Sequence, residues 1–182
     1  MWSSTFRLLL LADAHIRSKS DSLRLVKSLH HIINLEMPHA VVLLGNILDA
    51  SISDPRISLS ILTSYMKNRS LPYYMVIGNH DEEVLSEDEI LLHMHQKTSI
   101  FALNFDNVSS LVFLDSRNLS KSLMWMEHQN LHRPVLSFLH VPLFEYSLPS
   151  RVLLEPVSYD SEYGVLNQFR DFGVSAVFAG HD

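Results

Sequence analysis

Three short motifs along the chain combine residue types that bind divalent metal ions, and each motif directly follows an apolar run. They are Asp13-Ala14-His15, Gly45-Asn46-Ile47-Leu48-Asp49 and Gly78-Asn79-His80-Asp81. Carboxylate, amide and imidazole groups suit cations such as manganese, iron and zinc. We therefore expect metal-dependent hydrolytic chemistry, in which bound ions activate a water molecule.

Two later apolar runs end in the same way. His140 follows the run 134–139, and Gly180-His181-Asp182 follows Val177-Phe178-Ala179. The chain contains no cysteine, which removes disulfides, zinc-thiolate sites and thiol nucleophiles together. Any metal ion must then be held by His, Asp, Glu, Asn or water.

The apolar runs predict the strands that would position these residues. They are short, continuous and rich in branched and aromatic side chains, as is typical of strands covered on both faces. We predict strands at Phe6–Ala12, Ala40–Leu44, Tyr73–Ile77, Leu111–Leu114, Val135–Leu139 and Val174–Ala179.

Helical patterns lie between the predicted strands. Three helices are predicted from their start signals, which are Asp21, the pair Asp54-Pro55, and the capping box of Ser86 with Glu89. Two more are predicted at Ser120–Leu131 and at Tyr163–Phe172, the second of which is closed by Gly173. Alternating strands and helices favour a layered α/β domain. Ligands in such domains gather at the carboxyl ends of the strands, which is where all five motifs fall.

The composition limits the class of partner. A formal net charge of −6, with no cluster of Lys or Arg, gives no specific nucleic-acid signal. No stretch approaches the roughly 20 apolar residues that cross a bilayer. The apolar run that begins at Phe6 is better interpreted as a first strand than as a secretory signal. This favours the cytoplasm, although the compartment and the oligomeric state stay open.

The order of the motifs resembles that of the calcineurin-like metallophosphoesterase superfamily: D-x-H, G-N-x-x-D, G-N-H-D, a lone His at a strand end, then G-H. Within it, residues 138–143 with Glu145-Tyr146, and residues 176–182, look like the purple acid phosphatase-related branch. The resemblance spans nearly the whole chain. It implies an α/β fold of the layered αββα sandwich type, in a single domain over residues 1–182 that lacks its C-terminal part.

The resemblance also implies a function and a role for each motif. The protein would be a hydrolase that cleaves a phosphorylated substrate, a phosphomonoester, with two divalent ions (Mn, Fe or Zn). His80 would protonate the leaving group or steady charge on the phosphoryl group, and Asp81 or Asp49 would orient imidazoles. Six residues stand at the metal-ligand positions: Asp13 and His15 for the first ion, Asn46 at the bridging position, and Asn79, His140 and His181 for the second ion.

The sequence departs from the family pattern at two of these positions. The bridging position normally holds aspartate, where this chain has the neutral Asn46. The last motif normally reads G-H-x-H, where this sequence ends at Asp182, so either a longer protein continues or the first site lacks that ligand. Binding of one ion, or of none in a non-catalytic binding or scaffold domain of the same fold, is the alternative interpretation.

Other histidines are expected to be packing or surface residues. This holds for His30, His31, His93 and His95. His128 and His132 have the four-residue spacing of one helix face, but no carboxylate follows them and we do not expect a metal site there. The motif from Gly45 to Asp49 contains no tyrosine, so a purple iron-tyrosinate centre is not implied.

Overall fold

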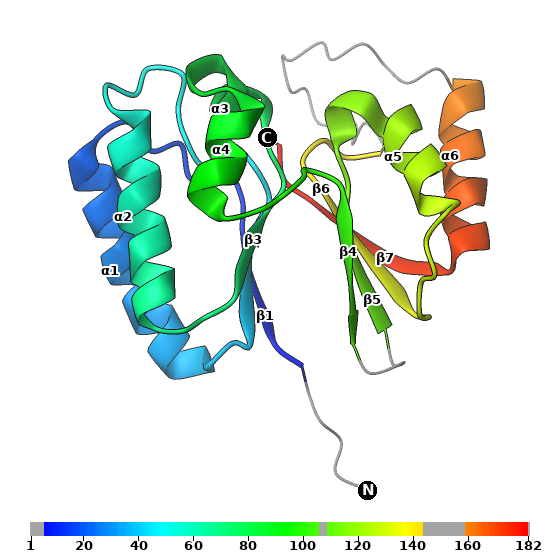
Figure 1. The fold of residues 1–182 in the computed structure, drawn as a ribbon, viewed down its shortest axis with the longest axis horizontal. Helices are drawn as coiled ribbons and strands as arrows, with labels where there is room; N and C mark the ends of the chain where they lie inside the picture. The colour runs from blue at the N-terminus through cyan, green and yellow to red at the C-terminus, as the bar shows by residue number, and fades with distance from the viewer. Residues whose placement is uncertain (1–5, 106–108, 144–158, 182) are drawn as a thin grey trace, which may run out of the picture. The chain divides into compact units, whose positions relative to one another are not determined.

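A computed structural model of the chain describes residues 6–105, 109–143 and 159–181, without the side chains of 159–163. The chain forms two compact units, Met1–Ser99 and Ile100–Asp182. Each unit contains one β-sheet with its own helices (Figure 1). None of the described helices is both long enough and apolar enough to span a bilayer.

The first unit is built on a three-stranded parallel sheet in the order β1-β2-β3. Its elements, in chain order, are β1 (Leu8–Leu11), α1 (Lys19–Glu36), β2 (Ala40–Leu43), α2 (Pro55–Asn68), β3 (Tyr73–Met75), α3 (Asn79–Val84) and α4 (Glu87–Met94). Every residue of the central strand β2 is buried, as its continuous apolar sequence predicts. Figure 1 shows α1 and α2 packed side by side beside this sheet.

The helix starts follow the capping chemistry in the sequence. The Asp54 side chain accepts from the Ile57 amide with Pro55 in the first turn, and Ser86 forms the predicted capping box with Glu89. Helix α1 begins earlier than Asp21 indicated, because Ser18 is its N-cap and accepts a hydrogen bond from the Asp21 amide. These caps determine the residue at which each helix begins.

A side-chain amide secures the strand that leads to the third motif. Gln96 accepts from the backbone N–H of Met75 at 2.7 Å and donates to the carbonyl of the same residue at 3.0 Å. The pair of bonds imitates a neighbouring strand on β3, which is an edge strand within this sheet. Gln96 thus stabilises the backbone three residues before Gly78.

The second unit has a four-stranded sheet in the order β4-β5-β6-β7, antiparallel between β4 and β5 and parallel elsewhere. Its elements are β4 (Phe101–Phe105), β5 (Ser109–Phe113), the 3-10 turn η1 (Ser116–Asn118), α5 (Leu119–Met126), β6 (Val135–Leu139), α6 (Tyr159–Phe172) and β7 (Val174–Ala179). Helices α5 and α6 contribute Leu123, Met126 and Phe169 to a core with sheet residues such as Val112 and Leu139.

A ladder of four phenylalanines, one from each strand, crosses this second sheet. Phe101, Phe113, Phe138 and Phe178 stack in sequence, with ring centroids 4.4, 5.1 and 5.2 Å apart. Cross-strand aromatic pairs of this kind stabilise a sheet and fix its register. The ladder therefore fixes the strands that end at His140 and precede His181.

All six predicted strands are present, but three elements differ from expectation. Strand β4 was not predicted, and helix α3 begins at Asn79, where only a strand end was expected. Helix α5 ends at Met126, so His128 and His132 do not share a helix face, contrary to their spacing. Gly173 closes α6 with a φ of 77°, as predicted.

Candidate metal centre

The first two motifs lie side by side because their backbones bond to each other. The amides of Asp13 and His15 donate to the carbonyls of Gly45 and Asn46, at 3.1 and 3.0 Å, and the amide of Ile16 donates to Ile47. Strands β1 and β2 are parallel neighbours, so both motifs leave the same edge of the sheet. The fold thus brings D-x-H and G-N-x-x-D together.

The backbone at these motifs occupies an unusual conformation. Four of the predicted ligand residues have positive φ: Asp13 at 50°, His15 at 43°, Asn46 at 51° and His181 at 65°. Left-handed backbone is costly for residues with a Cβ, and such residues cluster at functional sites. The backbone hydrogen bonds between the first two motifs hold Asp13, His15 and Asn46 in these conformations.

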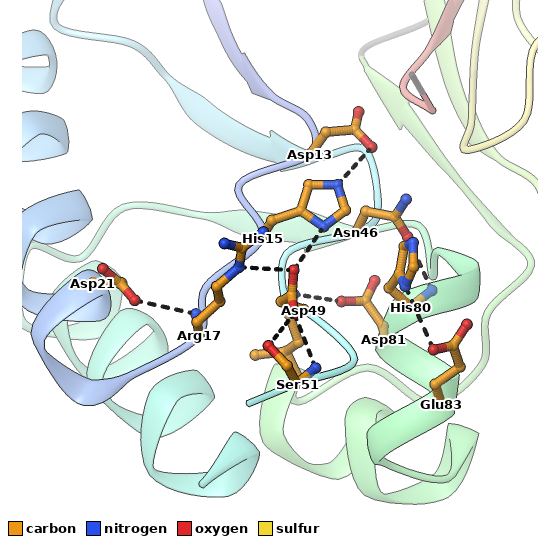
Figure 2. Close-up of polar contacts among 11 residues, drawn as sticks. Asp13, His15, Arg17, Asp21, Asn46, Asp49, Ser51, His80, Asp81 and Glu83 are labelled. Atoms are coloured by element: carbon orange, nitrogen blue, oxygen red, sulfur yellow. Dashed lines mark hydrogen bonds and ion pairs between the residues drawn. The ribbon is translucent and has the colours of Figure 1, made fainter. Parts of the chain in front are cut away.

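His15 lies between two carboxylates (Figure 2). Its Nε2 atom is 4.0 Å from Oδ1 of Asp13, and its Nδ1 atom is 3.7 Å from Oδ2 of Asp49. A carboxylate beside Nδ1 favours the proton on that nitrogen and leaves the lone pair on Nε2, beside Asp13. An imidazole nitrogen and a carboxylate oxygen at this separation fit one divalent cation.

Asp49 is itself held by several donors. It accepts from the Ser51 side chain and amide, and Nε of Arg17 donates to its Oδ2 at 3.1 Å. The hydrogen bonds from Ser51, followed by that from Arg17, hold the pKa of Asp49 well below its usual range. These donors therefore favour the ionised form of Asp49 beside His15.

Asn46 is fixed between the second and third motifs. Its side chain is buried, and its Oδ1 accepts from the backbone N–H of His80 at 3.1 Å. Because Gly78 carries no side chain, the Asn46 backbone and amide can approach it closely. One lone pair of the amide oxygen is thus used by the protein, and a role for Asn46 as a metal ligand stays a prediction.

Asp81 supports the backbone of the site. It is fully buried and accepts from the amides of Leu48 at 2.8 Å and Gly78 at 2.9 Å. Burial raises its pKa to about 6, opposed by these backbone hydrogen bonds. Of the two carboxylates expected to orient imidazoles, Asp49 lies beside one, whereas Asp81 binds backbone amides.

His80 and Asn79 open the short helix α3. Asn79 is exposed at the first helical position, and the His80 side chain is 35% exposed. The His80 ring meets the His15 ring edge-on, with centroids 5.2 Å apart. His80 thus lies beside the pair of Asp13 and His15, which suits a group that acts on a ligand held there.

His140 and His181 form a second pair of possible ligands, in the other unit. Nε2 of His140 and Nδ1 of His181 are 3.1 Å apart, and the rings are nearly perpendicular. His140 is buried at the end of β6, and His181 follows β7. Two imidazole nitrogens at this separation can share a proton or bind one cation.

Among the residues described, no set of three or more His, Asp or Glu side chains is already gathered around one point. Each unit instead offers a pair, Asp13 with His15 and His140 with His181. The donor types of both pairs fit manganese, iron or zinc. That Asn79 shares an ion with His140 and His181 stays a prediction, and Asp182, like Glu145 and Tyr146, lies outside the described residues.

Sequence inspection missed three residues that line this region: Arg17, Ser51 and Glu83. Arg17 and Ser51 bind Asp49, and Glu83 lies 3.5 Å from Nδ1 of His80. Recognising Asn79 as a helix start would have identified Glu83, because residues three apart share a helix face.

Comparison with known proteins identifies the fold and the family of the chain. The chain resembles a dimetal phosphatase from Danio rerio whose crystal structure is known, with 15% sequence identity and a TM-score of 0.67 over 97% of this chain and 81% of that one. That likeness confirms the expected fold. No curated protein matches the sequence significantly. The sequence profile of calcineurin-like phosphoesterases matches residues 6–182, and the chain therefore belongs to the calcineurin-like phosphoesterase family.

Proposed function

We propose that the protein hydrolyses phosphomonoesters with bound divalent metal ions. The observation that carries the proposal is the placement of His15, with Nε2 beside Asp13 and Nδ1 facing the carboxylate of Asp49. A carboxylate behind a histidine orients it as a metal ligand and raises its basicity. Together with membership of the phosphoesterase family, this favours an ion held by Asp13 and His15.

Bound ions in such sites supply an activated water and stabilise charge on the phosphoryl group. The protein groups do the rest. Asp13 and His15 of the first unit would hold one ion, and His140 and His181 of the second unit would hold another. His80, next to His15, would place a proton on the leaving oxygen. Manganese, iron and zinc all suit these ligands.

The sequence around β6 and β7 supports a finer assignment. Residues 138–143 and 176–182 resemble the purple acid phosphatase-related branch. We infer membership of that branch from these segments alone, and we expect a colourless enzyme because no tyrosine lies between Gly45 and Asp49.

A second candidate is a non-catalytic domain of the same fold. Asn46 favours it, because the amide is neutral and its oxygen is already bonded to the His80 backbone. With Asn46 in the bridging position, the six predicted ligands contain one carboxylate, Asp13. A site with so little negative charge would hold two divalent ions weakly.

The experiment that separates the two functions measures metal content and turnover together. We expect phosphate release from a generic aryl phosphate with added Mn²⁺, loss of activity on chelation, and a fall of roughly 100-fold or more in His80→Ala. His31→Ala, an exposed histidine on α1, is the matched control. A chain loaded with metal that turns over no phosphoester would support the non-catalytic candidate.

A further inference from the structure

The imidazole of His80 is restrained by its surroundings. Its backbone N–H donates to Asn46, and its ring packs edge-on against His15 at an interplanar angle of 71°. Nδ1 is buried and makes no hydrogen bond within the described part of the chain. The side chain as a whole is 35% exposed, so solvent reaches atoms of the ring other than Nδ1.

One carboxylate faces this buried nitrogen. Oε2 of Glu83 lies 3.5 Å from Nδ1 of His80, from the next turn of α3 (Figure 2). The separation is slightly longer than a hydrogen bond, and contacts around catalytic groups often tighten when a ligand binds. Glu83 can therefore receive a proton carried on Nδ1.

Two other carboxylates of the site bind other groups. Asp49 faces His15 and accepts from Arg17 and Ser51. Asp81 accepts from backbone amides and is fully buried. Glu83, whose carboxylate faces Nδ1, is thus placed to orient the His80 ring.

We propose that Glu83 is a positioning residue that keeps the proton of neutral His80 on Nδ1, so that Nε2 is the atom presented to the substrate. A neutral histidine side chain in water prefers the opposite tautomer, with the proton on Nε2. Glu83 would reverse that preference by accepting from Nδ1–H. The proposal rests on the proposed function, in which the imidazolium of His80 gives its Nε2 proton to the leaving oxygen and becomes the neutral ring that keeps its proton on Nδ1.

Nitrogen NMR of the imidazole tests the proposal without requiring turnover. In metal-free, ¹⁵N-labelled protein at a pH where His80 is neutral, we expect its Nδ1–H tautomer to dominate. Its signals are identified by their loss in His80→Gln. Glu83→Ala should shift the ring towards the Nε2–H tautomer, and Glu83→Gln should shift it less, because the amide oxygen still accepts. Glu82→Ala, on the same helix turn, should leave it unchanged.

Turnover provides the second measurement. If the chain hydrolyses an aryl phosphate, Glu83→Ala should lower kcat about tenfold or more with KM unchanged, as for residues that orient a reacting group. A dominant Nε2–H tautomer in the unaltered chain, or the same tautomer ratio in Glu83→Ala, would overturn the proposal. Absence of turnover would instead count against the proposed function, since the tautomer result stands by itself.

Discussion

Asn46 packs against Gly78 so closely that no side chain fits between them. A Cβ atom on Gly78 would lie 2.4 Å from Oδ1 of Asn46 and 2.3 Å from its backbone nitrogen. The same Asn46 oxygen accepts from the His80 amide. One glycine thus allows the second motif to fix the start of α3, and with it the catalytic candidate.

Replacing Gly78 by alanine should therefore disrupt the site. A shift of the Asn46 backbone would disturb its hydrogen bond with the His15 amide, so we expect a loss of about 1–3 kcal/mol in the free energy of unfolding. Urea unfolding measures it. Gly164→Ala is the matched control, because an added Cβ there meets nothing within 4 Å. Equal stability of the two variants would show that the loop relaxes freely.

Replacing Asn46 by aspartate, the usual residue at the bridging position, should make thermal stability depend on bound metal ions. In Asn46→Asp the new carboxylate can still accept from the His80 amide but is buried, so we expect a lower Tm than that of the unaltered chain without metal. When Mn²⁺ is added, the Tm of the variant should rise by more than that of the unaltered chain, and the variant should bind more metal. Asn167→Asp, exposed on α6, is the control. An equal rise with metal in the variant and the unaltered chain would argue against Asn46 as a ligand position.

Removing the charge behind His15 should weaken metal binding. Asp49→Asn keeps the size of the side chain but removes the carboxylate that favours a proton on Nδ1 of His15. We expect Mn²⁺ affinity to fall roughly 10- to 100-fold, as for other residues that orient a ligand. Titration calorimetry compares this variant with Asp88→Asn, an exposed acid on α4. Equal affinities would mean that Asp49 has no influence on the ion.

The sequence predicts the strands well because each is a continuous apolar run with a distinct end. Strands β6 and β7 have the predicted bounds. Strand β4 was missed because its Phe-Ala-Leu-Asn-Phe sequence is short and has an exposed Asn104, and its stability comes from pairing with β5 and stacking of Phe101 on Phe113. Such tertiary contacts leave no local sequence pattern.

The candidate site was predictable in its residue types but not in its pairings. Asp49 lies 32 to 34 residues from Arg17 and His15, so its contacts depend on how the loops after β1 and β2 meet. The role of Asp81 depends on burial, which a polar motif does not reveal. Positive φ at Asp13 and Asn46 is equally invisible in sequence, because both residue types adopt many backbone conformations.

The ion pair between Arg56 and Glu89 should make stability depend on pH. Hydrogen bonds from Arg56, followed by those from Ser86, lower the pKa of Glu89 to about 2, against 4.5 in an unstructured chain. A depressed pKa stabilises the folded state fully above pH 4.5, and that contribution is lost as the pH falls towards 2.

We expect Glu89→Gln to be less stable than the unaltered chain at pH 7, and the difference in urea midpoint to shrink from pH 5 to pH 3. Because Glu89 and Arg56 are partly exposed, added salt should also reduce the difference. Glu36→Gln, an exposed acid at the end of α1, should show no such trend. A difference that is independent of pH would show that the capping hydrogen bonds, and not the charge of Glu89, stabilise α4.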